Sequence, residues 1–226
     1  MKKVLVLNGS PKAVSDTMVL TNAFLGGMNN CGQFKIEVID VIKKNINPCI
    51  GCFKCWEKGD GKCIQEDDQN DILEKYVGAD IIILSFPLYC YAMPSHLKAV
   101  LDRTIPLIQQ KMVEVDGAVC HVPLVDFSRK KTIVISGCGF PDWDGNFEGL
   151  RIMSKNSFRD PIMIFVPETP MMNASEAKCV AKPLADKFVV AGKEFAENYT
   201  LSDDTIKALE TPMIPKEDYL AVINRT

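Results

Sequence analysis

Residues 3–12 read Lys3-Val4-Leu5-Val6-Leu7-Asn8-Gly9-Ser10-Pro11-Lys12, an apolar run that stops at a polar turn containing glycine. Consecutive Val and Leu residues are typical of a strand buried on both faces of a sheet. Residues 17–28, after the turn, fit a helix. A strand, a turn and a helix in this order predict the first unit of a parallel α/β sheet.

Short apolar runs continue to alternate with helical patterns along the chain, as expected for a parallel sheet with helices on both faces. Five strands are predicted, over residues 3–7, 35–40, 80–85, 131–136 and 161–166. Two more helices are predicted over residues 94–110 and 181–198. In the first of these, Leu97, Leu101 and Ile105 are spaced four residues apart on one face.

The composition favours one main domain that acts on small molecules. The chain has 226 residues, of which 47% are hydrophobic and 24% charged, and this length supports one sizeable core. A net charge of -3 argues against a nucleic-acid partner, which needs a clustered basic excess. The apolar run at residues 4–7 is too short for a signal peptide or a membrane span, so no membrane contact and a cytoplasmic location are expected.

Residues 1–198 are predicted to form the main domain, with an insertion at residues 45–70 and a tail at residues 199–226. The tail holds two short helical patterns, over residues 202–209 and 216–224. Both insertion and tail lack enough neighbouring core in a single domain, so we expect each to pack against another subunit of a homodimer or homotetramer. In the alternative, a monomer, the tail folds back over its own helices.

The turn after the first strand is suited to hold a phosphate. It lies where a helix N-terminus offers backbone N–H groups and the positive end of its dipole. Ser10, Ser15 and Thr17 can donate hydroxyl hydrogen bonds, and Lys12 can supply positive charge. The turn lacks the dinucleotide and Walker glycine patterns, which favours a terminal monophosphate and hence FMN over FAD.

Two further loops follow predicted strands and are expected at the same sheet edge. They combine aromatic side chains with close-approach backbone, which a flavin ring needs for its flat faces and its polar edge. The residues assigned to this ring site are Pro87, Leu88, Tyr89, Cys90 and Tyr91 in one loop, and Gly137, Cys138, Gly139 and Phe140 in the other.

Nine cysteines in a chain without an export signal indicate thiols, metal ligands or redox chemistry rather than a disulfide framework. Cys49, Cys52, Cys55 and Cys63 form a C-x2-C-x2-C-x7-C run. Three bunched cysteines match a cubane iron-sulfur centre, while redox-active thiols and zinc are the alternatives. The other five cysteines are read as core or loop thiols.

No acid-base machinery stands out, no catalytic side chain is assigned, and His96 and His121 are given packing or surface roles.

The chain resembles the flavodoxin-like NAD(P)H-dependent FMN reductases over roughly residues 2–198. Gly9-Ser10-Pro11-Lys12 with Ser15-Asp16-Thr17, Pro87-Leu88-Tyr89 and Met93-Pro94 carry the likeness. With the four cysteines added, it is most similar to the iron-sulfur flavoproteins. The resemblance implies a doubly wound sheet of order 2-1-3-4-5, FMN with a [4Fe-4S] cluster, and oligomers that bring a cluster close to a neighbour's flavin. Asp16 stands where Asn is common, and we expect it to cap the helix rather than face a phosphate.

The leading functional hypothesis is an FMN-dependent oxidoreductase that transfers electrons between the flavin and the cluster. NAD(P)H, quinone or ferredoxin are the expected electron donors or acceptors. The alternatives are an NAD(P)H-dependent FMN or quinone reductase without a cluster, and a non-enzymatic electron carrier of the flavodoxin type.

Overall fold

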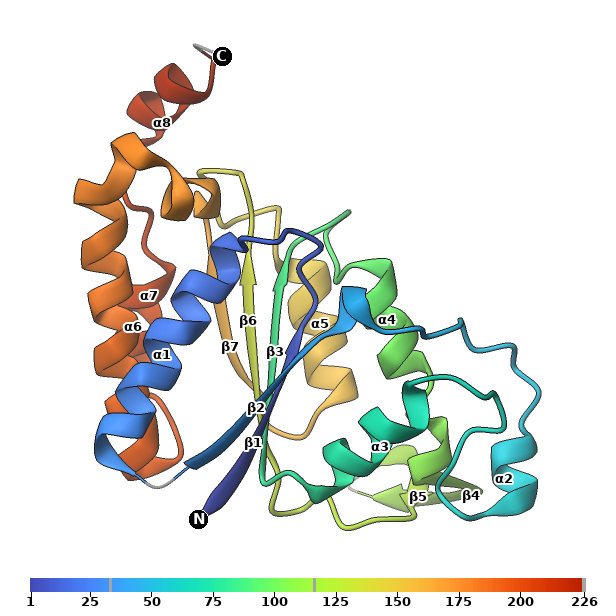
Figure 1. The fold of residues 1–226 in the computed structure, drawn as a ribbon. Coiled ribbons are helices and arrows are strands. Elements are labelled where there is room, and N and C mark those ends of the chain that lie inside the picture. The colour runs from blue at the N-terminus through green and yellow to red at the C-terminus, as the bar shows by residue number, and fades with distance from the viewer. Residues whose placement is uncertain (33, 116, 225–226) are drawn as a thin grey trace.

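The computed structural model describes residues 1–32, 34–115 and 117–224. A five-stranded sheet of order β2-β1-β3-β6-β7 forms its centre, and all neighbouring strands are parallel (Figure 1). The strands are β1 (Lys2–Asn8), β2 (Phe34–Asp40), β3 (Ile81–Pro87), β6 (Lys131–Gly137) and β7 (Ile162–Val166). The five predicted strands and the 2-1-3-4-5 order of the flavodoxin-like fold are therefore confirmed.

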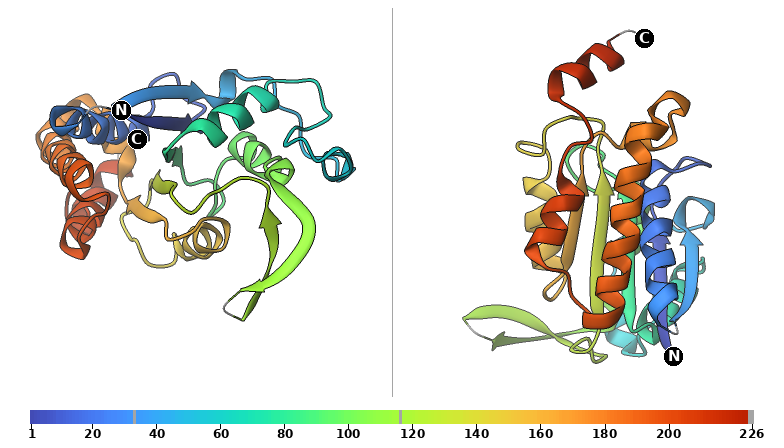
Figure 2. Two further views of the ribbon diagram at one scale, coloured as in Figure 1. Left: turned by 90° about the horizontal axis from the view of Figure 1, so that it is seen from below. Right: turned by 90° about the vertical axis from the view of Figure 1, so that its left-hand side faces the viewer.

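Helices cover both faces of this sheet (Figures 1 and 2). On one face lie α1 (Asp16–Cys31) and α6 (Lys178–Asn198); on the other lie α3 (Gln69–Gly78), α4 (Ser95–Asp102) and α5 (Glu148–Ser157). Along β1, Val4 and Val6 face the first layer, while Leu5 and Leu7 face the second. Burial on both faces explains why the strands are continuous apolar runs rather than alternating ones.

Two glycines let α1 and α6 pack with their backbones almost in contact. A Cβ added to Gly27 would lie 2.0 Å from the carbonyl oxygen of Val189. A Cβ added to Gly192 would lie 2.0 Å from the carbonyl oxygen of Phe24. Only glycine fits at such positions, so these residues set the distance between the two helices.

The predicted helix over residues 94–110 is wrong in its second half. α4 ends at Asp102, and β4 (Ile108–Val115) begins a two-stranded antiparallel hairpin with β5 (Ala118–Pro123). Pro106 has no N–H to continue an α-helix, and Ile105–Leu107 form a short 3-10 turn instead. The spacing of Leu97, Leu101 and Ile105 therefore spans a helix end.

The tail folds back on its own domain through α7 (Asp203–Glu210) and α8 (Lys216–Ile223). Leu201 and Leu209 join the core beneath α1 and α6, and Tyr219 packs with Met171. The two helical patterns of the tail are confirmed. Leu220 and Val222 of α8 are 42% and 46% exposed, so the packing of the tail against another subunit stays a prediction.

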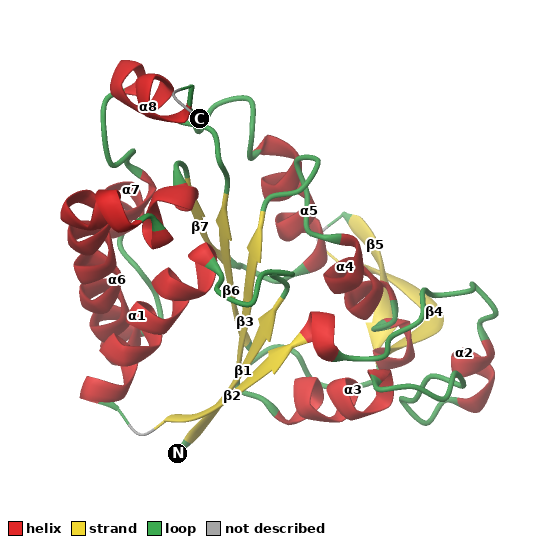
Figure 3. Ribbon diagram, turned by 45° about the horizontal axis from the view of Figure 1, so that its top comes forward, coloured by secondary structure: helices red, strands yellow, loops and turns green. Residues whose placement is uncertain are grey.

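Between β2 and α3 the chain runs outward through the short helix α2 (Lys54–Lys58), which lies beside the hairpin at the side of the molecule away from α6 and α7 (Figure 3). Within residues 1–32, 34–115 and 117–224, no helix is long and apolar enough to cross a membrane.

Candidate functional site

The first candidate site lies at the carboxyl edge of the sheet. From β1 the chain crosses to β2 on one side, whereas β3 pairs with β1 on the other. Such a reversal of strand order opens a crevice in which doubly wound folds bind their ligands. The turns after β1, β3 and β6 all meet at this edge (Figure 1).

The turn after β1 is held from three sides. The Gly9 N–H donates to the Ser85 carbonyl at 2.8 Å, which ties the turn to β3. The Nε2 atom of His96, in the first turn of α4, lies 2.9 Å from the Gly9 carbonyl oxygen. The Ser10 N–H donates to Asn8 Oδ1 at 3.0 Å. His96 therefore has a positioning role under this turn.

The hydroxyl groups assigned to the phosphate gather at the start of α1. Ser10 and Thr17 are each 2% exposed, and Ser15 is 7% exposed. The Ser15 hydroxyl oxygen accepts the Met18 N–H at 3.2 Å, which makes Ser15 the N-cap of α1. Its hydroxyl hydrogen is still available to donate. Neutral donors at the positive end of a 16-residue helix are chemistry that fits a phosphate monoester.

Lys12 and Asp16 form an ion pair at 2.6 Å beside these hydroxyls. Asp16 also accepts a hydrogen bond from Asn173 Nδ2 at 2.7 Å. The expectation that Asp16 caps the helix is wrong, because Ser15 has the extended backbone of an N-cap and Asp16 is already helical. Asp16 instead balances the charge of Lys12 at the rim of the turn.

The loop after β3 forms a tight turn that presents aromatic side chains to solvent. Tyr89 and Ala92 exchange backbone hydrogen bonds of 2.9 and 3.0 Å. Between them, Cys90 and Tyr91 have positive φ angles of 48° and 62°, which residues other than glycine seldom adopt. Tyr89 and Tyr91 are 46% and 56% exposed, so the turn offers flat apolar surface at the site.

The loop after β6 lies against the loop after β3, because the Leu88 N–H donates to the Gly137 carbonyl at 2.7 Å. Phe140 is 53% exposed, whereas Cys138 is only 4% exposed. Burial raises the pKa of Cys138 to about 11, so its thiol stays protonated at neutral pH. Its backbone is engaged too, since its N–H donates to the Val166 carbonyl at 3.0 Å and its carbonyl accepts the Thr169 N–H at 2.9 Å. Cys138 therefore holds the loop in place beside the site.

Two residues that the sequence analysis did not single out secure this loop. Tyr219 in α8 donates its hydroxyl hydrogen to the Gly139 carbonyl at 2.7 Å. The fully buried Glu168 accepts the backbone N–H groups of Met213 and Ile214 at 2.7 and 3.2 Å. Burial raises the pKa of Glu168. No local pattern marks either residue, because their partners are 45 to 80 positions away.

A second candidate site lies in the insertion, where the four clustered cysteines line one small cavity. Its other walls are mainly apolar and include Ile50, Phe53 and Ile105. Cys55 is buried in α2, Cys63 is half-buried, and Cys49 and Cys52 are exposed. The backbone winds around the cavity with positive φ angles at Gly51, Phe53, Gly59 and Gly61.

The neck of the insertion is closed by two adjacent carboxylates. Asp68 accepts the Asn45 N–H at 2.8 Å, and Asp67 accepts the Asn47 N–H at 2.9 Å. Asp68 makes no side-chain cap for α3. These residues therefore join the two ends of the insertion, and Asp68 stands at the N-cap position of α3 without capping it through its side chain.

Arg103 lies at the base of the same cavity and is only 1% exposed. Its Nη1 donates to Asp67 at 2.5 Å and to the Asn47 carbonyl at 3.0 Å. Burial acts to lower the pKa of Arg103, but Asp67 and Cys63 raise it above its usual value. The cavity therefore combines four thiols with one fixed cation.

In the described part of the chain, no group of three or more His, Cys, Asp or Glu side chains has the arrangement of a metal site. The four cysteines share a cavity without forming a coordination sphere. Their chemistry nevertheless fits an iron-sulfur centre, since such centres take four thiolates in apolar surroundings. The buried Arg103 fits it as well, because a thiolate-bound cluster is anionic.

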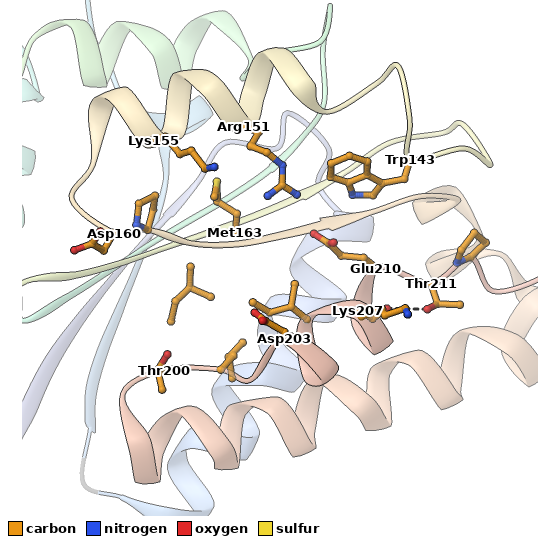
Figure 4. Close-up of a pocket in the computed structure, with 15 residues that line it drawn as sticks. Trp143, Arg151, Lys155, Asp160, Met163, Thr200, Asp203, Lys207, Glu210 and Thr211 are labelled. Carbon is orange, nitrogen blue, oxygen red and sulfur yellow. Dashed lines mark hydrogen bonds between the residues drawn. The ribbon is translucent and has the colours of Figure 1, made fainter.

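A third cavity of about 1030 Å³ runs along the outer edge of β7 (Figure 4). The guanidinium carbon of Arg151 lies 4.7 Å from the ring centre of Trp143 in a cation-π contact. Glu210 accepts the Phe165 N–H at 3.0 Å, which satisfies a donor on this edge strand. None of the predicted site residues lines this groove.

The family model of the NADPH-dependent FMN reductases matches residues 2–121. An iron-sulfur flavoprotein of Methanocaldococcus jannaschii is 39% identical over 105 residues, which are 46% of this chain and 53% of that protein. An iron-sulfur flavoprotein of Methanosarcina thermophila is 27% identical over 188 residues, which are 81% of this chain and 94% of the relative. The chain thus spans only about half the length of the first of these relatives.

Solved structures with the same fold include an NAD(P)H:quinone oxidoreductase from Methanothermobacter marburgensis. It has a TM-score of 0.63 at 17% identity, and the match covers 86% of this chain and 96% of the oxidoreductase chain. An FMN-dependent NADH-azoreductase from Bacillus anthracis, solved with FMN, has a TM-score of 0.62 at 16% identity, with coverages of 87% and 100%. At these identities the likeness is one of fold.

Proposed function

The chain belongs to the NADPH-dependent FMN reductase family, and from this membership we propose that it is an oxidoreductase that uses FMN and a [4Fe-4S] cluster. The observation that carries the flavin part is the turn after β1, where buried hydroxyls gather at a helix N-terminus beside the reversal of strand order. The observation that carries the cluster part is the single cavity lined by Cys49, Cys52, Cys55 and Cys63.

In this proposal Ser10, Ser15 and Thr17 donate hydrogen bonds to the FMN phosphate. Lys12 supplies positive charge at the rim, where Asp16 holds its ammonium group. Buried neutral donors suit a phosphate because hydrogen bonds to a charged group are strong and the helix N-terminus adds its positive dipole end.

The ring site is proposed to consist of the two loops that meet beside the turn. Tyr89, Tyr91 and Phe140 offer flat apolar faces, backbone groups of Pro87, Leu88, Cys90, Gly137 and Gly139 serve the polar edge, and Cys138 holds its loop in place. When bound, FMN supplies two-electron chemistry, and the protein orients it and limits access to it.

The cysteine cavity would hold the cluster and exchange single electrons with the flavin. The expected electron donors and acceptors are NAD(P)H, a quinone or a ferredoxin. A homodimer or homotetramer is the proposed assembly, in which a cluster approaches the flavin of a neighbouring chain.

Anaerobic purification followed by iron, acid-labile sulfide and flavin analysis tests the proposal. We expect one FMN and close to four irons and four sulfides per chain, the composition of a [4Fe-4S] cluster. Absence of iron and sulfide after reconstitution would contradict the cluster. It would leave the alternative of an NAD(P)H-dependent FMN or quinone reductase, which the family membership favours.

Rapid mixing with NADH, NADPH and reduced ferredoxin separates an enzyme from an electron carrier. An enzyme of this family should be reduced by a nicotinamide and should turn over with a quinone. Reduction by ferredoxin alone, without turnover of a small molecule, would support the flavodoxin-type carrier instead.

A further inference from the structure

Arg103 has two hydrogen-bond donors that nothing in the described part of the chain accepts. Its Nη1 is engaged by Asp67 and by the Asn47 carbonyl. Its Nε and Nη2 atoms are buried and make no hydrogen bond to any described residue. The side chain is 1% exposed, so bulk water does not replace the missing acceptors.

Such an arrangement costs free energy unless a ligand completes it. A buried donor left without a partner destabilises the fold, and a charged donor does so more strongly than a neutral one. The cavity at which Arg103 lies has apolar walls at Ile50, Ile64, Ile105 and Pro106, and Arg103 is the one charged residue that lines it. A buried cation with free donors in an apolar cavity is stabilised by an anionic ligand in that cavity.

The cysteines identify the chemistry of that occupant. All four line the same cavity as the guanidinium group of Arg103. Four thiolates around a cubane carry net negative charge, and the sulfur atoms of such a centre accept hydrogen bonds. The forked guanidinium group offers two donors in a fixed geometry, which a lysine cannot imitate.

We propose that Arg103 donates hydrogen bonds from Nε and Nη2 to sulfur atoms of the iron-sulfur centre on its Cys63 side, and so raises the reduction potential of that centre. Reduction adds negative charge, and a fixed cation with two sulfur-directed donors stabilises the reduced form more than the oxidised form. This inference rests on the cluster part of the proposed function.

Asp67 is the residue that positions Arg103 for this role. Its side chain is fully buried, and it accepts from Nη1, the Asn47 backbone and Gln69 N–H. Asp67 engages Nη1 alone, so Nε and Nη2 are left without an acceptor among the described residues. The carboxylate also joins the neck of the insertion, so the same residue aligns both the cation and the cysteine segment.

The test compares full-length R103Q and R103K with the wild-type protein, each reconstituted anaerobically. The measurements are iron and sulfide content, and the midpoint potentials of cluster and flavin in a redox titration followed by absorbance and electron paramagnetic resonance. K98Q is the matched control, because Lys98 is a neighbouring cation that pairs with Asp102 at the surface, away from the cavity lining.

In R103Q we expect the cluster to become at least tenfold harder to reduce, which is about 59 mV for one electron. R103K should shift the potential in the same direction by less, since it keeps the charge and loses the fork. The flavin potential, and both potentials of K98Q, should stay at the wild-type values.

The outcomes separate the two proposals. A wild-type protein without iron and sulfide overturns the proposed cluster. A wild-type protein that holds the cluster, with unchanged cluster potential in R103Q, overturns the role of Arg103 alone. If R103Q does not fold or does not load, R103K decides, and an unchanged cluster potential in R103K overturns the role.

Discussion

Ser10 and Thr17 place two buried hydroxyl groups at the start of α1, where the phosphate of FMN is proposed to bind. A hydrogen bond to a charged group typically contributes about 1.5–3 kcal/mol. Replacing both residues by Ala should therefore weaken FMN binding at least tenfold, measured by flavin fluorescence titration. Riboflavin serves as the control ligand, because it lacks the phosphate and should bind both proteins equally. Equal FMN affinity of the double variant and the wild type would refute the assignment.

Glu168 fastens the tail to the loop that carries the proposed ring site. It accepts two backbone N–H groups of the tail through one oxygen atom. Glu168→Ala should leave these donors without an acceptor and lower the free energy of unfolding by about 1–3 kcal/mol. Limited proteolysis should then cut the segment before α8. Glu168→Gln keeps an acceptor oxygen, so it should protect the tail almost as well as the wild type does.

The same residue predicts a pH dependence. Burial raises the pKa of Glu168 in the folded protein above its value in the unfolded chain. The folded state therefore binds the proton more tightly, and the stabilisation from protonation is lost as pH rises through the folded pKa. Relative to Glu168→Gln, the wild type should gain stability as pH falls from above the folded pKa of Glu168 to its unfolded pKa. Urea unfolding at a series of pH values measures this gain. A constant difference across that series would contradict this expectation.

At the scale of elements, the contact between α1 and α6 depends on glycine. A Cβ at position 27 would lie 2.0 Å from the Val189 carbonyl oxygen, so Gly27→Ala must push the helices apart. Overpacking of this kind costs about 1–3 kcal/mol. The matched control is Gly26→Ala in the same helix, where the added Cβ meets nothing within 4 Å. That change should raise stability by up to about 1 kcal/mol. Urea unfolding of both variants checks the contrast, and similar effects in the two would contradict it.

The insertion is ordered by contacts other than a conventional core. Its neck is closed by Asp67 and Asp68, as described above. Its far end is held by aromatic rings, with Phe53 and Trp56 stacked at 4.8 Å and Trp56 packed 5.2 Å from His121 of β5. Trp56 thus joins α2 to the hairpin by packing against His121.

At the scale of the whole molecule, exposed apolar side chains gather on the insertion and the hairpin. They are Ile50, Phe53, Met112, Val115 and Val119, with exposed fractions between 49% and 70%. Leu220 and Val222 of α8 are exposed as well, and these apolar surfaces are the reason to expect a homodimer or homotetramer.

Light scattering tests the expected assembly. The intact protein should have two or four times the chain mass of 25.1 kDa at micromolar concentration. Val119→Asp, on the hairpin, should lower that mass. Val190→Asp is the control, because Val190 is 62% exposed on the distant helix α6. A monomeric mass for the intact protein would remove the basis for electron exchange between subunits.

Local sequence was sufficient for the strands, the turn after β1 and the two tail helices. Each of these depends on neighbouring residues, since runs of Val and Ile favour buried strands and a polar stretch with glycine favours a turn. The same holds for the cysteine run, whose spacing brings four thiols to one loop. The 2-1-3-4-5 order came from the likeness to a family.

Tertiary structure alone decided the hairpin, the burial of Arg103 and the roles of Glu168 and Tyr219. Met112 pairs with His121 only after α4 has ended at Asp102, whereas the four-residue spacing through Ile105 favoured a longer helix. Arg103 lies inside the segment predicted as one helix, and it is buried because Asp67, 36 positions earlier, provides the opposite charge. Such pairings depend on how distant segments meet, and no local pattern of residues encodes that meeting.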